Sequence, residues 1–169
     1  EMFRESLDIY EMAFSASEYQ YEGEFYKIPK APLSISPVQT EIPETWITGL
    51  SDSPELMKRI AQSGYTPFAT AGPRSASSLL SVKRRWQEKY EEVGKDPAEM
   101  PFAIQRNLFI SDNPTEVGHA ADSIRYTARV ATSMRNRTQS LNGNMLEEFP
   151  ADGELSLDEI ETNALIGDV

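Results

Sequence analysis

Apolar residues recur along the chain at two spacings, one typical of helices and the other typical of strands. Stripes of apolar residues three and four positions apart predict helices over residues 2–16, 53–63, 75–93 and 114–136. Short runs rich in β-branched and aromatic residues predict strands over residues 45–49, 65–69 and 102–110. Strands that alternate with helices of these lengths indicate parallel βα units, so the pattern predicts an α/β fold.

The stretch 44–64 is the clearest of these units. Its strand stops at Gly49, and a small polar turn follows. Pro54 suits the first position of the next helix, because the N–H that proline lacks would have no partner there. Gly64 ends the helix. The stretch therefore predicts a strand, a short turn and a helix.

The turn in this unit is a candidate anion site. A helix start has free backbone N–H groups, and the helix dipole favours negative charge there. Ser51 and Ser53 add hydroxyl donors, so the turn could hold a phosphate. The alternative is that Asp52 or Ser53 simply caps the helix. The carboxylate of Asp52 would also compete for the same donors.

The segments before this unit carry weaker signals. Residues 19–26 place aromatic residues on both sides of a Glu-Gly pair, which predicts a small hairpin with its turn at Gly23. Residues 29–43 are rich in proline, so we expect an extended segment that leads into the strand at 45–49.

The helical pattern is lost from Thr138 onwards. All charged residues of 145–168 are acidic, and we expect a mobile acidic excursion over 138–160, with at most a short helix over 156–162. Residues 165–167 read as the start of a final strand. Because the chain begins inside its first predicted helix and ends where a new element starts, we expect it to be cut at both ends.

Composition and charge narrow the classes of function. The 169 residues suffice for one domain with a hydrophobic core. With 16 basic and 27 acidic residues the net charge is −11, which disfavours nucleic acid and anionic membranes as partners. No apolar run approaches the length of a membrane span. The chain has no cysteine, which excludes disulfides, thiolate metal sites and a cysteine nucleophile, and it agrees with the cytoplasmic location that we expect.

Two further features have structural explanations. His119 is the only histidine, and no acid, serine or second histidine lies at a telling spacing, so we expect a surface or packing role and no metal site. The basic run 83–85 lies inside a predicted helix, and we interpret it as a solvated helix face.

Several motifs follow one another in an order that is found in a known protein family: MF.E.L.IY, YEGEFYKIP, PVQ, IPETWITGLSDSPEL, IAQSGYTPF, a Gly-Lys-Asp-Pro linker and ALIGDV. This order resembles the bacterial-luciferase-like family of flavin-dependent monooxygenases and oxidoreductases, over most of the chain. The resemblance implies an α/β fold that is part of a TIM (β/α)8 barrel. The three predicted strands resemble the fifth, sixth and seventh of the barrel, and residues 1–169 would form a single partial barrel domain. Residues 138–160 resemble the variable excursion before the eighth strand.

The resemblance also implies a cofactor site. Family members bring backbone and a small hydroxyl residue of the turn after the fifth strand to the flavin phosphate and ribityl chain, which matches Thr48, Gly49, Ser51 and Ser53. Active sites of barrels lie at this end of the strands. The turn is one residue longer than expected, which leaves open whether Ser51 or Ser53 makes the contact. No catalytic residue can be assigned, because the family's acid/base residues mostly come from strands that precede this part of the barrel.

The function implied is a flavin-dependent monooxygenase that oxidises a small organic molecule with reduced flavin and O₂. FMN is the expected cofactor, and F420 with hydride transfer is the alternative. A separate flavin reductase and a homo-oligomer are expected partners. Two other functions stay open: a non-catalytic partial barrel that self-associates through its unpaired strand edges, and a phosphate-binding module without redox chemistry that rests on the 49–55 turn.

Overall fold

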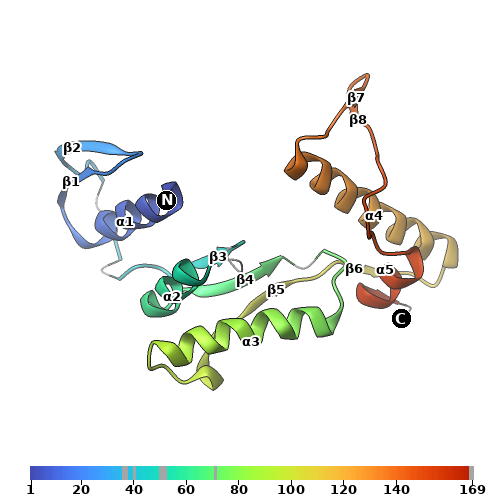
Figure 1. Cartoon of the computed structure of the whole chain (residues 1–169), viewed down its shortest axis with the longest axis horizontal. Coiled ribbons are helices and arrows are strands. Elements are labelled where there is room, and N and C mark those ends of the chain that lie inside the picture. Colours follow the sequence, from blue (N-terminus) through green and yellow to red (C-terminus); the bar gives the residue numbers. More distant parts are fainter. Residues whose placement is uncertain (36–37, 40, 50–52, 71, 168–169) are drawn as a thin grey trace.

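The computed structural model describes residues 1–35, 38–39, 41–49, 53–70 and 72–167, and Figure 1 shows the arrangement of their elements. In chain order the elements are α1 (Met2–Ser15), β1 (Glu18–Glu22), β2 (Lys27–Pro32), β3 (Trp46–Thr48), α2 (Pro54–Ser63), β4 (Thr66–Thr70), α3 (Ala76–Glu92), the 3-10 helix η1 (Pro97–Glu99), β5 (Ala103–Gln105), β6 (Leu108–Ile110), α4 (Pro114–Asn136), β7 (Leu141–Asn142), β8 (Met145–Leu146), α5 (Leu157–Asn163) and β9 (Leu165–Gly167). The predicted helices and strands occur in the predicted order, but 102–110 is divided between β5 and β6, and η1, β7 and β8 are additional elements.

The central strands are parallel neighbours. β3 pairs with β4 in the register Trp46 to Thr66, and β4 pairs with β5 in the register Phe68 to Ala103. The order β3-β4-β5 follows the chain, with a helix between successive strands. The prediction of neighbouring parallel strands is confirmed for 45–49, 65–69 and the first part of 102–110.

The strand predicted as continuous over 102–110 is interrupted, and that part of the prediction was wrong. β5 pairs with β4, whereas β6 pairs in parallel with β9. Between them lie Arg106 and Asn107, and the Asn107 carbonyl accepts a hydrogen bond from the Leu165 N–H (3.0 Å). The chain thus leaves one neighbouring strand and joins the next at this point. The pairing also confirms that residues 165–167 form a strand.

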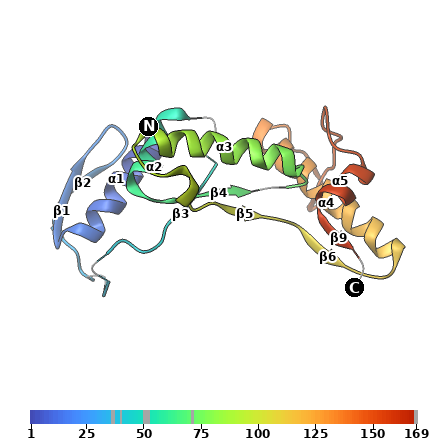
Figure 2. The same ribbon diagram turned by 90° about the horizontal axis from the view of Figure 1, so that it is seen from below.

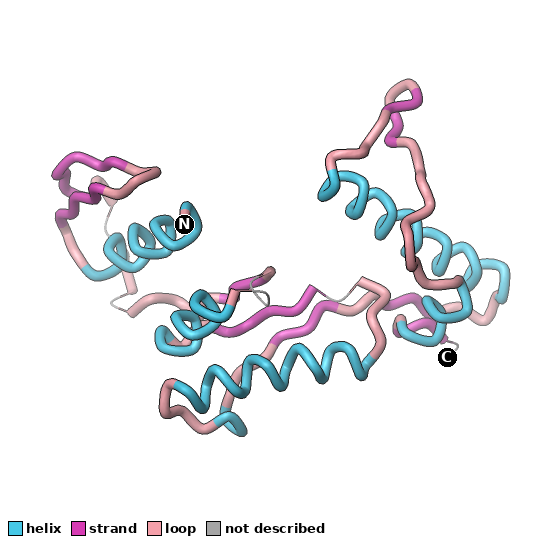
Figure 3. The backbone as a smooth tube through the Cα atoms, in the orientation of Figure 1, coloured by secondary structure: helices cyan, strands magenta, loops and turns pink. Residues whose placement is uncertain are grey.

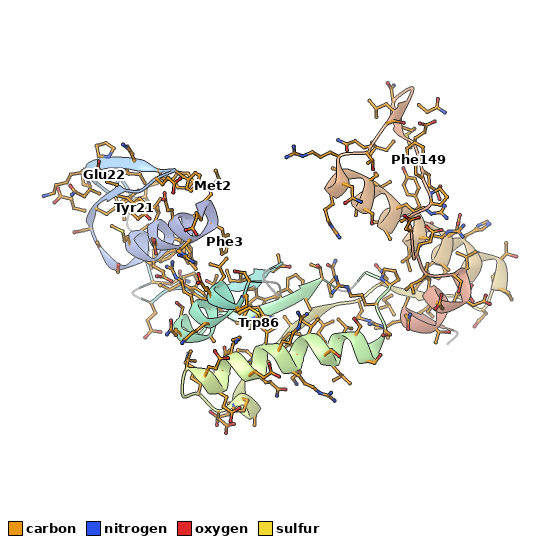
Figure 4. All side chains as sticks on the ribbon, viewed as in Figure 1. Met2, Phe3, Tyr21, Glu22, Trp86 and Phe149 are labelled. Carbon is orange, nitrogen blue, oxygen red and sulfur yellow. The ribbon has the colours of Figure 1, made fainter. Side chains whose placement is uncertain are left out.

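Helices cover one face of the central strands (Figures 1 and 2). α2 and α3 pack there around a core of Leu7, Met57, Ile60, Ala61, Tyr65, Val82, Trp86, Tyr90 and Met100. Trp86, labelled in Figure 4, comes from α3 and is only 3% exposed. The apolar stripe that predicts a helix over 75–93 consists mostly of residues that are buried in the structure. Their spacing therefore identified the buried side of α3.

The opposite face of β3 carries exposed side chains. Side chains alternate between the two faces of a strand. Ile47 packs on the core, so Trp46 and Thr48 point the other way. The ring of Trp46 lies 5.8 Å from that of Phe68, yet Trp46 remains 56% exposed. We call this side, represented by Trp46, Thr48 and Phe68, the concave face.

The first 35 residues form a helix and a hairpin at one end of the molecule (Figure 1). β1 and β2 pair antiparallel, with a turn in which the Gly23 N–H donates to the Tyr26 carbonyl (2.8 Å). The predicted hairpin is confirmed, although its second strand begins only at Lys27. α1 reaches the core through Leu7, whereas Phe3 of the same predicted stripe is 39% exposed.

The other end of the molecule contains α4, α5 and a short hairpin that the sequence pattern did not predict. α4 ends at Asn136, and its C-cap residue Arg137 has the left-handed conformation (φ 57°). The hairpin β7–β8 follows, and loops drawn pink in Figure 3 connect it to α4 and α5. α5 confirms the short helix expected over 156–162, and a capping box of Ser156 and Glu159 fixes its start. The mobility expected over 138–160 stays a prediction.

Candidate functional site

Thr48 and Gly49 lie where the sequence predicted, at the carboxyl end of β3. Thr48 ends the strand and pairs with Phe68 of β4. Gly49 has φ +80°, a conformation that strains other residues, and no atom lies within 4 Å of where its Cβ would be. Both residues are exposed. The backbone at this point is therefore open to a ligand.

Ser53 begins the next helix without capping it by its side chain. It occupies the N-cap position of α2, Pro54 follows as the first helical residue, and the Met57 N–H donates to the Ser53 carbonyl (2.9 Å). Its side chain makes no capping hydrogen bond, so the hydroxyl of Ser53 is available to a ligand. Ser51, the other predicted hydroxyl contact, lies outside the described residues, as does the rival Asp52.

A small cavity adjoins this end of the strands. One of its lining residues is an arginine that the sequence pattern did not single out. The cavity has a volume of about 70 Å³, and Gly49, Thr70 and Arg74 contribute to its lining. Ile47, Val82 and Trp86 contribute apolar surface to it. The guanidinium of Arg74 is exposed and forms no ion pair with any of the described residues. Arg74 thus brings a positively charged side chain to a cavity that Gly49 also lines.

A signal for Arg74 was present in the sequence. The residue follows Gly72-Pro73 in the turn between β4 and α3, which is the counterpart in the next βα unit of the turn at 49–53. Consecutive turns at the carboxyl ends of parallel strands meet at one edge of the sheet. A basic residue in the second turn was therefore a candidate partner for the first.

Two larger hollows lie nearby. One of about 490 Å³ shares Thr70 with the small cavity and is lined by uncharged residues, both polar (such as Gln105 and Thr127) and apolar (such as Ile124). The other, of about 630 Å³, is lined by Arg74 but also by Asp158 and Glu159. Two carboxylates disfavour an anion in this second hollow, whereas the cavity beside Gly49 has none in its described lining.

The most strongly perturbed tyrosine belongs to a structural network and not to this site. Burial raises the pKa of Tyr65, and a hydrogen bond from its hydroxyl to Glu11 (2.9 Å) raises it further. Glu11 also accepts hydrogen bonds from Ser63 (3.2 Å) and Arg59 (3.1 Å). These bonds hold α1 on α2. His119 is exposed on α4, as expected of a surface residue.

The donor set at the ends of β3 and β4 fits a phosphate group. Gly49 has an open backbone and lines one cavity with Arg74, and Ser53, at the start of α2, has a hydroxyl that does not cap its helix. Arginine binds phosphate through a planar pair of N–H donors, and hydroxyl groups and backbone N–H groups complete such sites. None of these described residues contributes a negative charge. The described residues here are therefore of the types that bind phosphate groups in proteins.

Over the described residues, no helix combines the length and the apolar character that a bilayer span requires.

Known proteins resemble this chain in sequence and in fold. A family model described as luciferase-like monooxygenase matches residues 1–168. Uncharacterized protein y4vJ of Sinorhizobium fredii is 27% identical over 169 residues, which covers 99% of this chain and 48% of that protein.

Two solved structures are similar in fold. An F420-dependent secondary alcohol dehydrogenase in complex with an F420-acetone adduct matches with a TM-score of 0.64 and 20% identity, over 97% of this chain and 47% of that one. Monooxygenase RslO1 from Streptomyces bottropensis matches with a TM-score of 0.58 and 15% identity, over 80% of this chain and 43% of that one. At these identities the likeness shows the fold alone, an α/β fold of the TIM-barrel type.

The chain spans about half the length of the relatives that it matches. The family match, in contrast, extends over nearly all of its residues. The chain belongs to the luciferase-like monooxygenase family.

Proposed function

We propose that this chain forms the phosphate-binding side of the active site of a flavin-dependent monooxygenase, which oxidises a small organic molecule with reduced flavin and O₂. The observation that carries the proposal is the position of Gly49 beside Arg74, at the carboxyl ends of two adjacent parallel strands. Family membership supplies the reaction class, that of an oxidoreductase.

In this proposal Thr48, Gly49, Ser51 and Ser53 bind the cofactor phosphate and the chain next to it. Gly49 leaves room for close approach of the backbone, and Ser53 offers a hydroxyl that its own helix does not use. Arg74 neutralises the phosphate charge. The neutral hollow of about 490 Å³ next to Thr70 suits an uncharged ring or substrate, since its lining offers hydrogen bonds without charge.

We assign β3, β4 and the β5–β6 pair to the fifth, sixth and seventh strands of the barrel, and β9 to the eighth. In that assignment the concave face is the barrel interior, which explains why Trp46 is 56% exposed in this chain. The excursion 138–160 would act as a lid that excludes water from the site.

FMN is the cofactor we favour, with F420 and hydride transfer as the alternative. The two share a phosphate, and the residues named here recognise that group. Bound flavin would supply the electrons for reaction with O₂, and the protein's part is to hold its phosphate and keep water out. A separate reductase that delivers reduced flavin and a homo-oligomeric assembly complete the proposal.

The proposal is tested by titrating the protein with FMN and with F420 and following ligand fluorescence. We expect saturable binding of at least one of them. Ser53→Ala and Ser51→Ala should each weaken binding by up to about tenfold, and Arg74→Gln by about tenfold or more. Ser81→Ala is the matched control, because the hydroxyl of Ser81 donates to the Ser77 carbonyl of its own helix (3.0 Å) and has no other partner among the described residues. Absence of binding for both ligands in a folded protein would refute the proposal.

A second candidate function is a non-catalytic partial barrel that acts through self-association. The observation in its favour is the concave face with exposed Trp46, together with Leu108 (68% exposed) and Ile110 (56% exposed) of β6. Apolar surface of this kind marks an interaction site. Concentration-dependent oligomers that bind neither FMN nor F420 would favour this candidate over the enzyme.

A further inference from the structure

Arg106 occupies the break between β5 and β6, where the chain leaves one neighbouring strand and joins the next. Its side chain is half-buried, and its backbone lies outside both strand ladders. An arginine in a strand interruption has no part in sheet pairing. The role of Arg106 must therefore be inferred from the contacts that its side chain makes.

The guanidinium of Arg106 donates to two backbone carbonyls from distant parts of the chain. Nη1 donates to the carbonyl of Arg74 (2.9 Å), and Nη2 donates to the carbonyl of Asn163. The first acceptor lies in the turn between β4 and α3, and the second lies at the end of α5, directly before β9. One side chain thus joins two segments that are far apart in sequence.

A third hydrogen bond closes the arrangement. The side-chain amide of Asn163 donates to the carbonyl of Pro73 (3.5 Å), so the two carbonyls of Pro73 and Arg74 both receive donors from this cluster. The backbone of the turn is fixed at two adjacent positions, while the guanidinium of Arg74 stays free of ion pairs within the described part of the chain.

We infer that Arg106 is a positioning residue, which fixes the 73–74 turn so that the guanidinium of Arg74 faces the cofactor phosphate. The inference rests on the proposed function for the identity of the ligand. Arginine suits this role because its planar fork serves two acceptors at once, whereas lysine offers a single nitrogen on a flexible chain. The cluster also links the turn to the segment that begins β9.

The test compares FMN with riboflavin, which lacks the phosphate, as ligands of Arg106→Gln, Arg106→Lys and the unmodified protein. We expect Arg106→Gln to weaken FMN binding about tenfold and to leave riboflavin binding nearly unchanged. Arg106→Lys should restore part of the loss. In a protein that already carries Arg74→Gln, the change at Arg106 should have little further effect, because the group that it positions is gone.

Amide hydrogen exchange gives a readout that needs no ligand. Arg106→Gln should speed exchange in residues 72–75 and 163–165 and leave α2 unchanged. Arg84→Gln is the control, since it removes an exposed arginine of α3.

The outcomes separate the two proposals. Equal weakening of FMN and riboflavin would indicate general damage to the fold and overturn the positioning role. Unchanged FMN binding in Arg106→Gln would overturn it as well. If the unmodified protein binds neither FMN nor F420, the proposed function fails. Unaltered exchange in residues 72–75 would then overturn the anchoring by Arg106 independently.

Discussion

The carboxylate of Glu5 lies where a side chain on Gly23 would have to be. A Cβ added at Gly23 would come within 2.3 Å of Oε2 of Glu5 and 2.4 Å of its carboxyl carbon. From α1, Glu5 accepts backbone N–H bonds from Glu24 (2.7 Å), Phe25 (3.0 Å) and Tyr26 (3.0 Å). Desolvation raises the pKa of Glu5, but these three bonds outweigh it, and the pKa lies below its usual value. One carboxylate therefore holds the hairpin turn on α1.

Gly23→Ala should destabilise this end of the molecule. The new methyl group would displace the Glu5 carboxylate and break its bonds to the turn. We expect the melting temperature to fall by roughly 2–4 °C, as measured by circular dichroism. In a protein that carries Glu5→Ala the same substitution should have a much smaller effect, because the clash is absent. An equal effect in both backgrounds would show that Glu5 is not the cause.

Gly118→Ala is a matched substitution that we expect to stabilise the protein. Gly118 lies inside α4, and no atom comes within 4 Å of where its Cβ would be. Alanine in a helix interior is favoured over glycine by roughly 0.5–1 kcal/mol. We expect the free energy of unfolding to rise by about that amount in urea denaturation. A loss of stability would mean that a neighbouring segment fills this space in solution.

The sequence predicted α3 well because a single pattern decides that helix. Leu79, Val82, Trp86 and Tyr90 recur at helical spacing, and all four are buried. The pattern failed where contacts from other parts of the chain decide the structure. The division of 102–110 into β5 and β6 depends on the position of β9, which pairs with only the second half. Nothing in the sequence of 102–110 itself indicates that β9 will pair with its second half.

Lys95 closes the carboxyl end of α2. Its Nζ donates to the carbonyls of Ala61 (2.5 Å) and Gln62 (3.1 Å), at the end of the helix where positive charge is favourable. We expect Lys95→Met to lower the free energy of unfolding by about 1 kcal/mol in chemical denaturation.

Lys58→Met is the control for Lys95. Lys58 is exposed on the same helix and makes no ion pair within the described residues, so its replacement should change the free energy of unfolding by less than about 0.5 kcal/mol. Similar losses for the two variants would indicate that the general charge of α2, and not its carboxyl end, is responsible.

Glu154 makes the stability of the segment before α5 depend on pH. Hydrogen bonds from Arg129, through Nε (2.6 Å) and Nη2, and from the Ala151 N–H (3.1 Å) lower the pKa of Glu154 from 4.5 to about 2. A lowered pKa in the folded state means that the stabilisation is fully present above pH 4.5 and is lost as the pH falls towards 2. Carbon-detected NMR titration of the Glu154 carboxyl group should show a midpoint near 2.

Glu154→Gln should remove this dependence. The variant is expected to be less stable than the unmodified protein at pH 7, and the difference should shrink as the pH falls from 4.5 to 2. Glu161→Gln is the control, because the carboxylate of Glu161 on α5 forms no ion pair in the described structure. A difference that stays constant with pH would show that Glu154 does not act through its charge.

The candidate site was only half predictable. Thr48, Gly49 and Ser53 follow from a local strand, turn and helix pattern, which lies within one stretch of sequence. Arg74 lies in the next βα unit, and its approach to Gly49 depends on the parallel pairing of β3 with β4. The role inferred for Arg106 requires contacts with both 73–74 and 163. Contacts between segments so far apart in sequence cannot be predicted from the spacing of residues along the chain.

The concave face can be observed through its tryptophan. The chain has two tryptophans, Trp46 at 56% exposure and Trp86 at 3%, so a neutral quencher such as acrylamide should reach only Trp46. Trp46→Phe should remove the quenchable component, whereas the emission of Trp86 should persist. If the chain self-associates, apolar surface of this kind would be buried between subunits, and we expect quenching of Trp46 to decrease as protein concentration rises. Quenching that is independent of concentration, together with a monomeric mass in light scattering, would show that a second copy does not cover this face.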